Sequence, residues 1–253
     1  MLTESNQNIV HQTLLRDINN AIIFENENFV VVNKPAGMLT IPDREQTQIS
    51  LKDVLLKKYA TIFTVHRLDR ETSGVVLFAK NEATHKYFSK QFEDRLVEKF
   101  YLGIVQGTPA QPTGTIDAPI MEHPALKGQM VVHKKGKPSI TDYEVQEIVG
   151  KYALLKFQIH TGRTHQIRVH AKNMGHPIIC DPLYGDGSPF LISSIKKKYN
   201  LSKQEEEEKP ILNRVALHSY QLKCTDSEGT QHNFIAELPK DMRALLQQLR
   251  KRK

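Results

Sequence analysis

The first segment with residues suited to chemistry spans 66–74 and places Asp69 between two arginines, Arg67 and Arg70. A carboxylate in a loop can act as a nucleophile or a general base when a rigid sheet holds the loop. The apolar stretch 75–79 that follows predicts a buried strand that anchors this loop. The same residues can equally form a surface salt bridge, and this segment alone does not decide between the two.

A second polar cluster follows residue 161, where Thr164 has the position of a helix N-cap. On the expected helix, His165, Arg168 and Lys172 are three and four residues apart and therefore share one face. Cations at the start of a helix suit an anionic partner, either a phosphate or a carboxylate. The alternative is an ordinary amphipathic helix with a solvated basic face, and these residues alone slightly favour it.

Three further patterns carry less information. Tyr101 stands where a strand is expected to begin, and a tyrosine there is more often a core residue than a catalytic one. The Lys-Pro-x-Gly turn within 33–37 is of a common kind. A metal site on His165 and His170 is not expected, because residues five apart do not stack on one helical face and no carboxylate stands at ligand spacing.

The composition allows a folded protein with a nucleic-acid partner. The 253 residues suffice for one large domain or two small ones, and the net charge of +7 is compatible with RNA binding. No apolar run approaches the ~18–20 residues that span a bilayer, and the N-terminus lacks a secretory pattern. We therefore expect a cytoplasmic protein without a membrane partner. Cys180 and Cys224 are expected to be buried thiols, with a disulfide between them as the alternative.

Hydrophobic periodicity predicts strands and helices without a regular βαβ rhythm, which indicates an α+β fold with a mixed, largely antiparallel central sheet and flanking helices. Strands are expected at 21–24, 29–33, 75–80, 100–106, 141–148, 152–160, 216–223 and 233–237. Helices are expected at 51–58, after the capping pair Ser50 and Asp53, and at 81–97, 165–174 and 241–251. Loops around short strands are expected at 108–138.

Taken in order, these segments resemble the RluA family of pseudouridine synthases. The stretch 33–37 matches that family's Asn-Lys-Pro-x-Gly turn, 66–74 its His-Arg-Leu-Asp-x-x-Thr-Ser-Gly loop, and 99–107 its Lys-x-Tyr strand. The stretch 162–170 matches its Gly-Arg-x-His-Gln-Ile-Arg-x-His motif. Shorter matches extend the resemblance over about residues 22–246, at 136–141, 176–185, 217–218 and 238–239.

The resemblance implies the pseudouridine synthase catalytic fold, with an active-site cleft across the middle of its sheet. It implies that Asp69 is the catalytic aspartate, that Tyr101 is an active-site tyrosine and that Arg168 pairs with the aspartate. Arg67 corresponds to a loop arginine that meets the RNA near a flipped base. Further residues of the matched motifs are expected to bind RNA or substrate: His66, Arg70, Lys99, Arg163, His165, Gln166 and Lys172.

The resemblance also implies one catalytic domain, residues 21–253, after an N-terminal extension, residues 1–20. That extension is too short for the S4-type RNA-binding domain of some family members. Substrate choice is then expected to depend on 123–137 and on 186–214, a charged surface insertion. The implied enzyme is a monomer without cofactor or metal, and it converts specific uridines in ribosomal RNA, transfer RNA or both.

Uridine isomerisation breaks the N1–C1′ bond and rebuilds the link through C5, without redox change or net hydrolysis. Asp69 is expected either to attack C1′ or to remove a proton from C2′, and the sequence does not choose between these routes. Arg168 would offset the cost of keeping a buried Asp69 ionised. Tyr101 would stack on the detached uracil and help to move the C5 proton.

Two other functions remain open at this stage. An RNA-binding protein without catalysis would share the basic surface but would not require Asp69, Tyr101 and Arg168 together. A metal-dependent hydrolase would bind its metal through the histidines at 160, 165 and 170.

Overall fold

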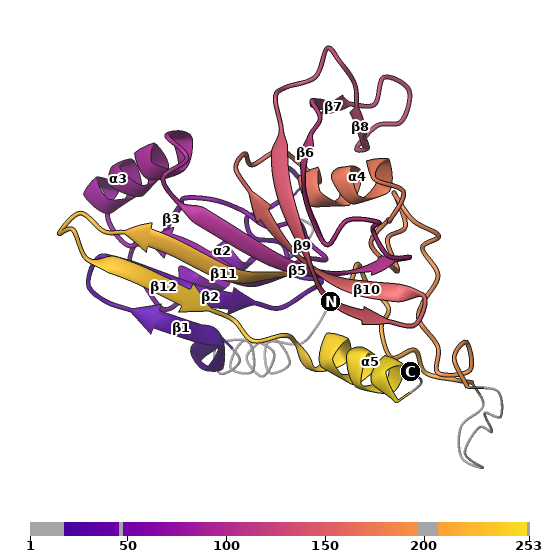
Figure 1. The fold of residues 1–253 in the computed structure, drawn as a ribbon. Helices are drawn as coiled ribbons and strands as arrows, with labels where there is room; N and C mark the ends of the chain where they lie inside the picture. Colours follow the sequence, from indigo (N-terminus) through magenta and orange to yellow (C-terminus); the bar gives the residue numbers. More distant parts are fainter. Residues whose placement is uncertain (1–17, 46–47, 197–206, 252–253) are drawn as a thin grey trace. The chain divides into compact units, whose positions relative to one another are not determined.

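The computed structural model describes residues 18–45, 48–196 and 207–251 of the chain. Their contacts divide the chain into two compact units (Figure 1). The first unit runs to Glu98 and also contains Ser219–Glu237, whereas the second contains Lys99–His218 and the residues from Leu238 onwards. Most of the expected N-terminal extension lies outside the described residues.

The strands of the first unit lie side by side in the order β1-β2-β4-β11, with β12 on β11 and β3 on the end of β4. The pairings of β1 with β2, β2 with β4, β3 with β4, and β11 with β12 are antiparallel. These strands are β1 (Ile22–Glu25), β2 (Phe29–Lys34), β3 (Phe63–Thr64), β4 (Ser73–Ala79), β11 (Leu217–Thr225) and β12 (Gln231–Ile235).

Strand β4 is the centre of this unit, and each of its seven residues is buried. Its continuous apolar sequence fits that position, because a strand covered on both faces needs no polar alternation. Its side chains Val75 and Leu77 join one core cluster with Phe29 of β2, Phe88 of helix α3 (Glu82–Glu93) and Phe234 of β12. The expected buried strand after the Asp69 loop is therefore confirmed.

Helices α2 and α3 of the first unit both start at side-chain caps, of which the one at Ser50 was expected. Helix α2 (Leu51–Leu55) has a reciprocal capping box, in which Ser50 and Asp53 each accept the backbone N–H of the other. Helix α3 starts after Asn81 and ends at Glu93, so the expected helix to residue 97 was too long. Arg95 adopts a left-handed conformation with φ of 61°, which turns the chain before the buried Val97 enters the core.

The second unit contains a sheet with the strand order β5-β10-β9-β6 and antiparallel pairing throughout this path. A separate antiparallel hairpin, β7–β8, lies beside helix α4 (Figure 1). The elements are β5 (Glu98–Gln106), β6 (Thr113–Asp117), β7 (Ile120–Glu122), β8 (Met130–Val132), β9 (Ile140–Val149), β10 (Tyr152–Ile159), α4 (Gln166–Asn173) and α5 (Lys240–Arg250). The expected β9–β10 hairpin and the α+β fold class are confirmed.

The start of α4 differs from the expectation. Thr164 is not its N-cap: His165 takes that position with a left-handed φ of 55° and no capping bond from its side chain. The side chain of Gln166 instead accepts the N–H of Arg163 (3.0 Å), which holds the turn before the helix. The helix ends as expected, because Gly175 follows it with a φ of 85° that suits glycine.

The two ends of the insertion at 186–214 pair with each other inside the second unit, whereas its middle lies outside the described residues. Phe190 and Leu212 form an antiparallel bridge, and both side chains are buried. Cys180 and Cys224 are buried free thiols, as expected. Within the described ranges, no helix has the length and apolar character needed to cross a membrane.

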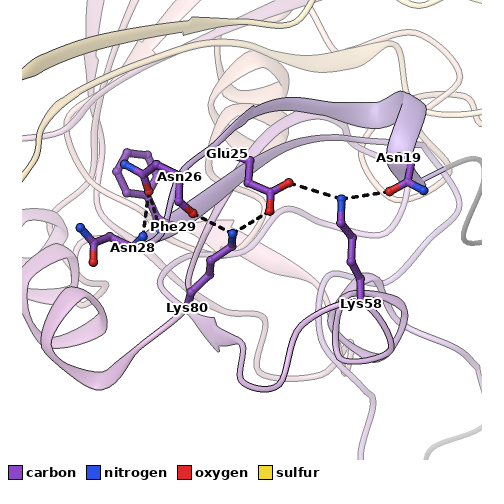
Figure 2. Close-up of polar contacts among 7 residues, drawn as sticks. All are labelled: Asn19, Glu25, Asn26, Asn28, Phe29, Lys58 and Lys80. Carbon is purple, nitrogen blue, oxygen red and sulfur yellow. Dashed lines mark hydrogen bonds and ion pairs between the residues drawn. The ribbon is translucent and has the colours of Figure 1, made fainter.

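A cluster of charged groups fixes the β1–β2 turn in the first unit (Figure 2). The side chain of Asn26 accepts the N–H groups of Asn28 and Phe29, which closes the turn expected at this point. The ammonium of Lys80 donates to Glu25 and to the Asn26 carbonyl, both at 2.7 Å. Lys58 reaches the other Glu25 oxygen at 3.3 Å, so Glu25 connects three segments.

This cluster predicts a pH-dependent stability. The hydrogen bond from Lys80 lowers the pKa of the Glu25 carboxyl from 4.5 to about 2. Because the folded pKa is the lower one, the cluster stabilises the fold above pH 4.5 and loses that contribution as the pH falls from 4.5 towards 2. In urea unfolding, Glu25→Gln should therefore be less stable than the parent at pH 7 and equal to it near pH 2. An unchanged difference across this range would contradict the assignment.

Candidate active site

The loop at 66–74 belongs to the first unit and carries Asp69 in a turn before β4. The Asp69 carbonyl accepts the N–H of Thr72 (3.1 Å), and the Asp69 side chain is partly exposed. Arg67 and Arg70 are exposed. Arg70 contacts the Gly37 carbonyl (3.1 Å) and lies 3.6 Å from Glu71. The turn is thus a backbone structure that presents Asp69 from a fixed position.

A buried lysine holds this loop against the turn at 33–37. Lys34 is fully buried, and its ammonium donates to the carbonyls of Pro35 (3.0 Å), Met38 (2.7 Å) and Arg70 (3.0 Å). Three donors meeting three carbonyls satisfy an ammonium that has been removed from water. Since Arg70 directly follows Asp69, this bond fixes the backbone next to the carboxylate. The N–H of Gly37 adds a second bond to the Arg70 carbonyl (2.9 Å).

Two more side chains fix the loop before Asp69. The Thr40 hydroxyl donates to the Leu68 carbonyl (2.9 Å) and accepts the Leu68 N–H (3.1 Å), and the side chains of both residues are buried. His66 accepts the N–H of Leu77 through Nε2 (3.0 Å) and stacks on Phe92 with ring centres 4.6 Å apart. His66, expected to bind RNA, thus also has a structural role as an anchor of the loop.

The glycine that ends the motif is required by the packing of β4 on β11. Gly74 has a φ of 113°, and a Cβ atom there would lie 2.1 Å from the carbonyl oxygen of Ser219. Any side chain would force the two strands apart. The loop is therefore fixed at both ends by β4.

The second unit contributes Tyr101 and Lys99 on β5, and both side chains are buried. Tyr101 is paired in register with Phe157 of β10, which gives it a rigid sheet position. Arg163 is half-buried, and its Nε lies 3.4 Å from the Pro138 carbonyl. The sheet thus holds Tyr101 and Lys99 in place, and the loop at 136–141 holds Arg163.

Arg168 of α4 forms a bidentate ion pair with Asp181. Its Nε and Nη2 each lie 2.7 Å from one carboxylate oxygen, and both side chains are nearly inaccessible to water. Asp181 also accepts the N–H groups of Leu183 and Tyr184. The guanidinium is therefore fixed in position by a fully hydrogen-bonded carboxylate. The expected pairing of Arg168 with Asp69 joins residues of different units and stays a prediction.

Tyr184 connects the cationic face of α4 to the β7–β8 hairpin. Its hydroxyl accepts the N–H of Met130 (2.8 Å) and lies 2.8 Å from Nδ1 of His165. Its ring centre lies 5.0 Å from the Arg168 guanidinium carbon and 5.9 Å from the Lys172 ammonium. The structure thus brings His165, Arg168 and Lys172 together around one aromatic ring, so the face is more than a solvated basic surface.

Gln166 and His170 fix the other side of α4. The Gln166 amide accepts from Thr161 and donates to the Ile140 carbonyl and to Thr141. His170, which is fully buried, bonds to Thr141 (2.9 Å) and to the Ala118 carbonyl (2.9 Å), and burial lowers its pKa. The described bonds of Gln166, which was expected to bind RNA, make it part of the scaffold.

Four residues have central structural roles that were not predicted from the sequence: Lys34, His170, Asp181 and Tyr184. Each stands in a matched motif, which indicates that the residue matters but does not predict which residue it contacts. A lysine beside a turn proline gives no indication of burial, and Asp181 is thirteen residues from the arginine that it pairs with. Only the folded chain reveals these partners.

Residues 28–173 match the sequence profile of the RNA pseudouridylate synthase family. This range exceeds half of the chain and includes Asp69, Tyr101 and Arg168. The chain therefore belongs to the RNA pseudouridylate synthase family, and the resemblance drawn from the motifs is confirmed.

Several named family members are similar to much of the chain. The dual-specificity RNA pseudouridine synthase RluA of Vibrio vulnificus is 39% identical over 68% of this chain and 72% of its own length. The ribosomal large subunit pseudouridine synthase D of Nitrosomonas europaea is 35% identical over 90% of this chain and 65% of its own. An uncharacterised Aquifex aeolicus synthase is 41% identical over 70% of this chain. The chain spans only 58% to 66% of the length of the Aquifex protein, the Nitrosomonas protein and a third relative.

Two solved human structures share the fold. RNA Pseudouridylate Synthase Domain Containing 4 is 26% identical, with a TM-score of 0.75 over 96% of this chain and 98% of its own. RNA Pseudouridylate Synthase Domain Containing 1 is 25% identical, with a TM-score of 0.66 over 91% of this chain and 94% of its own. These likenesses confirm the expected pseudouridine synthase fold.

The Lys34 bonds predict that Lys34→Met loosens the Asp69 loop. Methionine fills a similar volume but donates no hydrogen bond, so the carbonyls of Pro35 and Met38 lose this partner at about 1–3 kcal/mol each, and the Arg70 carbonyl keeps only the N–H of Gly37. Amide hydrogen exchange across 66–74 should accelerate by about tenfold or more. Lys86→Met, at an exposed position of α3, is the control and should leave this exchange unchanged. Equal protection in both variants would refute the role of Lys34.

The Arg168–Asp181 pair predicts a specific pattern in urea unfolding. Arg168→Met leaves a buried carboxylate unpaired and should cost about 3–5 kcal/mol. Adding Asp181→Asn removes that charge while retaining an acceptor for the N–H groups of Leu183 and Tyr184. The double variant should therefore be more stable than Arg168→Met alone.

The matched control is Arg250→Met, which breaks the exposed pair with Glu147 and should cost less than about 1 kcal/mol. If Arg168→Met with Asp181→Asn lost as much stability as the two single variants together, the buried pair would not act as a unit.

Proposed function

We propose that this chain is an RNA pseudouridine synthase that isomerises specific uridines in ribosomal RNA, transfer RNA or both. The observation that carries the proposal is the family match over 28–173, which contains an Asp69 loop pinned by Lys34, Thr40 and His66. A loop held in this way can keep a carboxylate in one position while a large substrate binds. Preorganisation of this kind is what catalysis at a sugar carbon requires.

Asp69 is proposed as the carboxylate that acts at the ribose of a uridine extruded from its stack. Either it attacks C1′ or it removes a proton from C2′, and in both routes the N1–C1′ bond breaks. The uracil then turns and C5 bonds to C1′, while the Asp69–C1′ bond breaks in the first route or Asp69 returns the proton to C2′ in the second. The C5 proton leaves, and N1 gains a proton, so the reaction is an isomerisation without a cofactor. Extruding the base costs a few kcal/mol, and least from a loop.

The other expected site residues are proposed to hold the RNA and the detached base. Tyr101 stacks on the uracil and its phenol assists transfer of the C5 proton. Arg168 stabilises ionised Asp69, and the exposed Arg67 fills the space that the base leaves. Five further residues are proposed to contact the RNA: Lys99, Arg70, Arg163, His165 and Lys172. Such phosphate contacts make binding weaken with added salt.

The alternative of a metal-dependent hydrolase is disfavoured by where the three histidines lie. His160 pairs with Asp142 at 2.6 Å, His165 bonds to Tyr184, and His170 bonds to Thr141. Each ring thus contacts a different partner. An RNA-binding protein without catalysis is the remaining alternative, and the intact set of Asp69, Tyr101 and Arg168 argues against it.

The compartment and the assembly are also proposals. We propose that the chain works in the cytoplasm as a monomer. One relative is named for dual specificity and another for the ribosomal large subunit, so the names do not point to a single target. Mapping pseudouridine in total RNA from cells with and without the gene would identify the target.

Asp69→Asn should abolish the reaction while the loop stays folded, because the turn is held by the backbone and by neighbouring side chains. Tritium release from RNA labelled at uridine C5 measures the reaction, since the C5 hydrogen leaves when C5 bonds to C1′. We expect a fall of at least about a hundredfold, with RNA affinity largely retained. Asp94→Asn, at the exposed C-cap of α3, is the matched control and should keep full activity. Near-normal release by Asp69→Asn would refute its catalytic role.

A further inference from the structure

A pocket lies in the second unit where the β7–β8 hairpin meets helix α4. Its volume is about 360 Å³, at the small end of the range of roughly 300–1,000 Å³ for ligand pockets. The apolar part of its lining includes Leu126, Met130 and Val132 of the hairpin segment and Val169 of α4. Leu126 is exposed to 48% although it is a large apolar side chain. A pocket of this size suits a single planar group rather than a peptide or a helix.

The polar residues of the pocket are suited to the edge of a nucleobase. Gln129 and Asn173 both line it and offer amide groups that donate and accept. His123 also lines it, and its Nδ1 accepts the N–H groups of Ala125 and Leu126, so the neutral ring carries its proton on Nε2. Unpaired RNA bases are recognised by this combination of an apolar or aromatic contact and hydrogen bonds to the base edge.

The charge around the pocket favours a polyanion. The segment 120–137 contains four lysines, at 127, 134, 135 and 137, against one carboxylate, Glu122, and the lysines are exposed. Lys172 adds a further cation to the lining itself. A phosphate backbone that passes over the pocket would meet these ammonium groups, whereas an acidic or neutral small molecule would not use the whole surface.

Tyr184 makes the pocket continuous with the candidate catalytic residues of this unit. It lines the pocket, bonds to Met130 of the hairpin and lies 5.0 Å from the guanidinium carbon of Arg168. A nucleotide bound here would therefore lie one side chain away from Arg168. Figure 1 shows the hairpin and α4 next to one another, with the loop that joins β7 to β8 reaching beyond the sheet.

We propose that this pocket is a second nucleobase site, which binds one unpaired nucleotide of the substrate RNA close to the uridine that is modified. The base lies on the apolar residues Leu126, Val132 and Val169, its edge bonds to Asn173 or Gln129, and its phosphate contacts Lys172. The site selects RNA loops in which a second base is free to leave its stack. This assignment rests on the proposed function, because it takes the chain's ligand to be RNA.

The test uses RNA hairpins whose loop contains one uridine and is otherwise randomised. The full-length protein binds this pool, and the bound RNA is sequenced before and after reaction. Wild type should enrich one nucleotide at one loop position outside the modified uridine. Leu126→Ala and Asn173→Ala should each reduce that enrichment by about fivefold or more. Both positions are exposed, so the fold tolerates the changes. Leu96→Ala, an exposed leucine of the first unit, should behave as wild type.

The outcomes separate this site from the activity. If pseudouridine forms and the bound pool is the same for wild type and both pocket variants, or wild type shows no second preference, the second base site is refuted. If wild type forms no pseudouridine in any hairpin but Leu126→Ala still removes the nucleotide enrichment from the bound RNA, the second base site is supported and the proposed activity is refuted.

Discussion

The ammonium of Lys34 is buried completely, so its charge can be tolerated only if its donors meet acceptors inside the protein. The carbonyls that it bonds belong to the turn at 33–37, to Met38 and to Arg70. These bonds join two loops that are far apart in the sequence and fix the backbone directly after Asp69. The loop therefore keeps its shape without regular secondary structure, and Asp69 is held in a fixed position just before the apolar strand β4.

The second unit also depends on a buried charged group with fixed hydrogen-bond partners, but there the group is a carboxylate and not an ammonium. Here a buried carboxylate, Asp181, holds the guanidinium of Arg168 and caps the turn that carries Tyr184. Tyr184 in turn contacts the cationic face of α4 and the β7–β8 hairpin. In both units a buried charge is stabilised by fixed polar partners, and residues proposed to bind RNA lie close to it. Such sites are rigid before the substrate arrives.

The sequence predicted the elements well where a local signal exists. The capping pair Ser50 and Asp53, the apolar run of β4 and the β9–β10 hairpin all depend on neighbouring residues. It failed at Thr164, because the bond that holds the start of α4 comes from Gln166, and at the end of α3, because Arg95 reverses the chain. The partners of Lys34 and Arg168 depend on tertiary contacts that no spacing encodes. The roles of Asp69, Tyr101 and Arg168 came from the family motifs, because the loop alone fitted a salt bridge equally well.

The central claim is that the pinned loop presents the Asp69 carboxylate to the ribose of an extruded uridine. A crystal structure with an RNA that carries 5-fluorouridine at the target position tests it most directly, since fluorine at C5 blocks the loss of a proton that completes the reaction. We expect an extruded nucleoside with an Asp69 oxygen bonded to C1′, or within about 3.5 Å of C1′ or C2′. We also expect the three Lys34 bonds to be unchanged. A bound base whose sugar lies away from Asp69 would contradict the central claim.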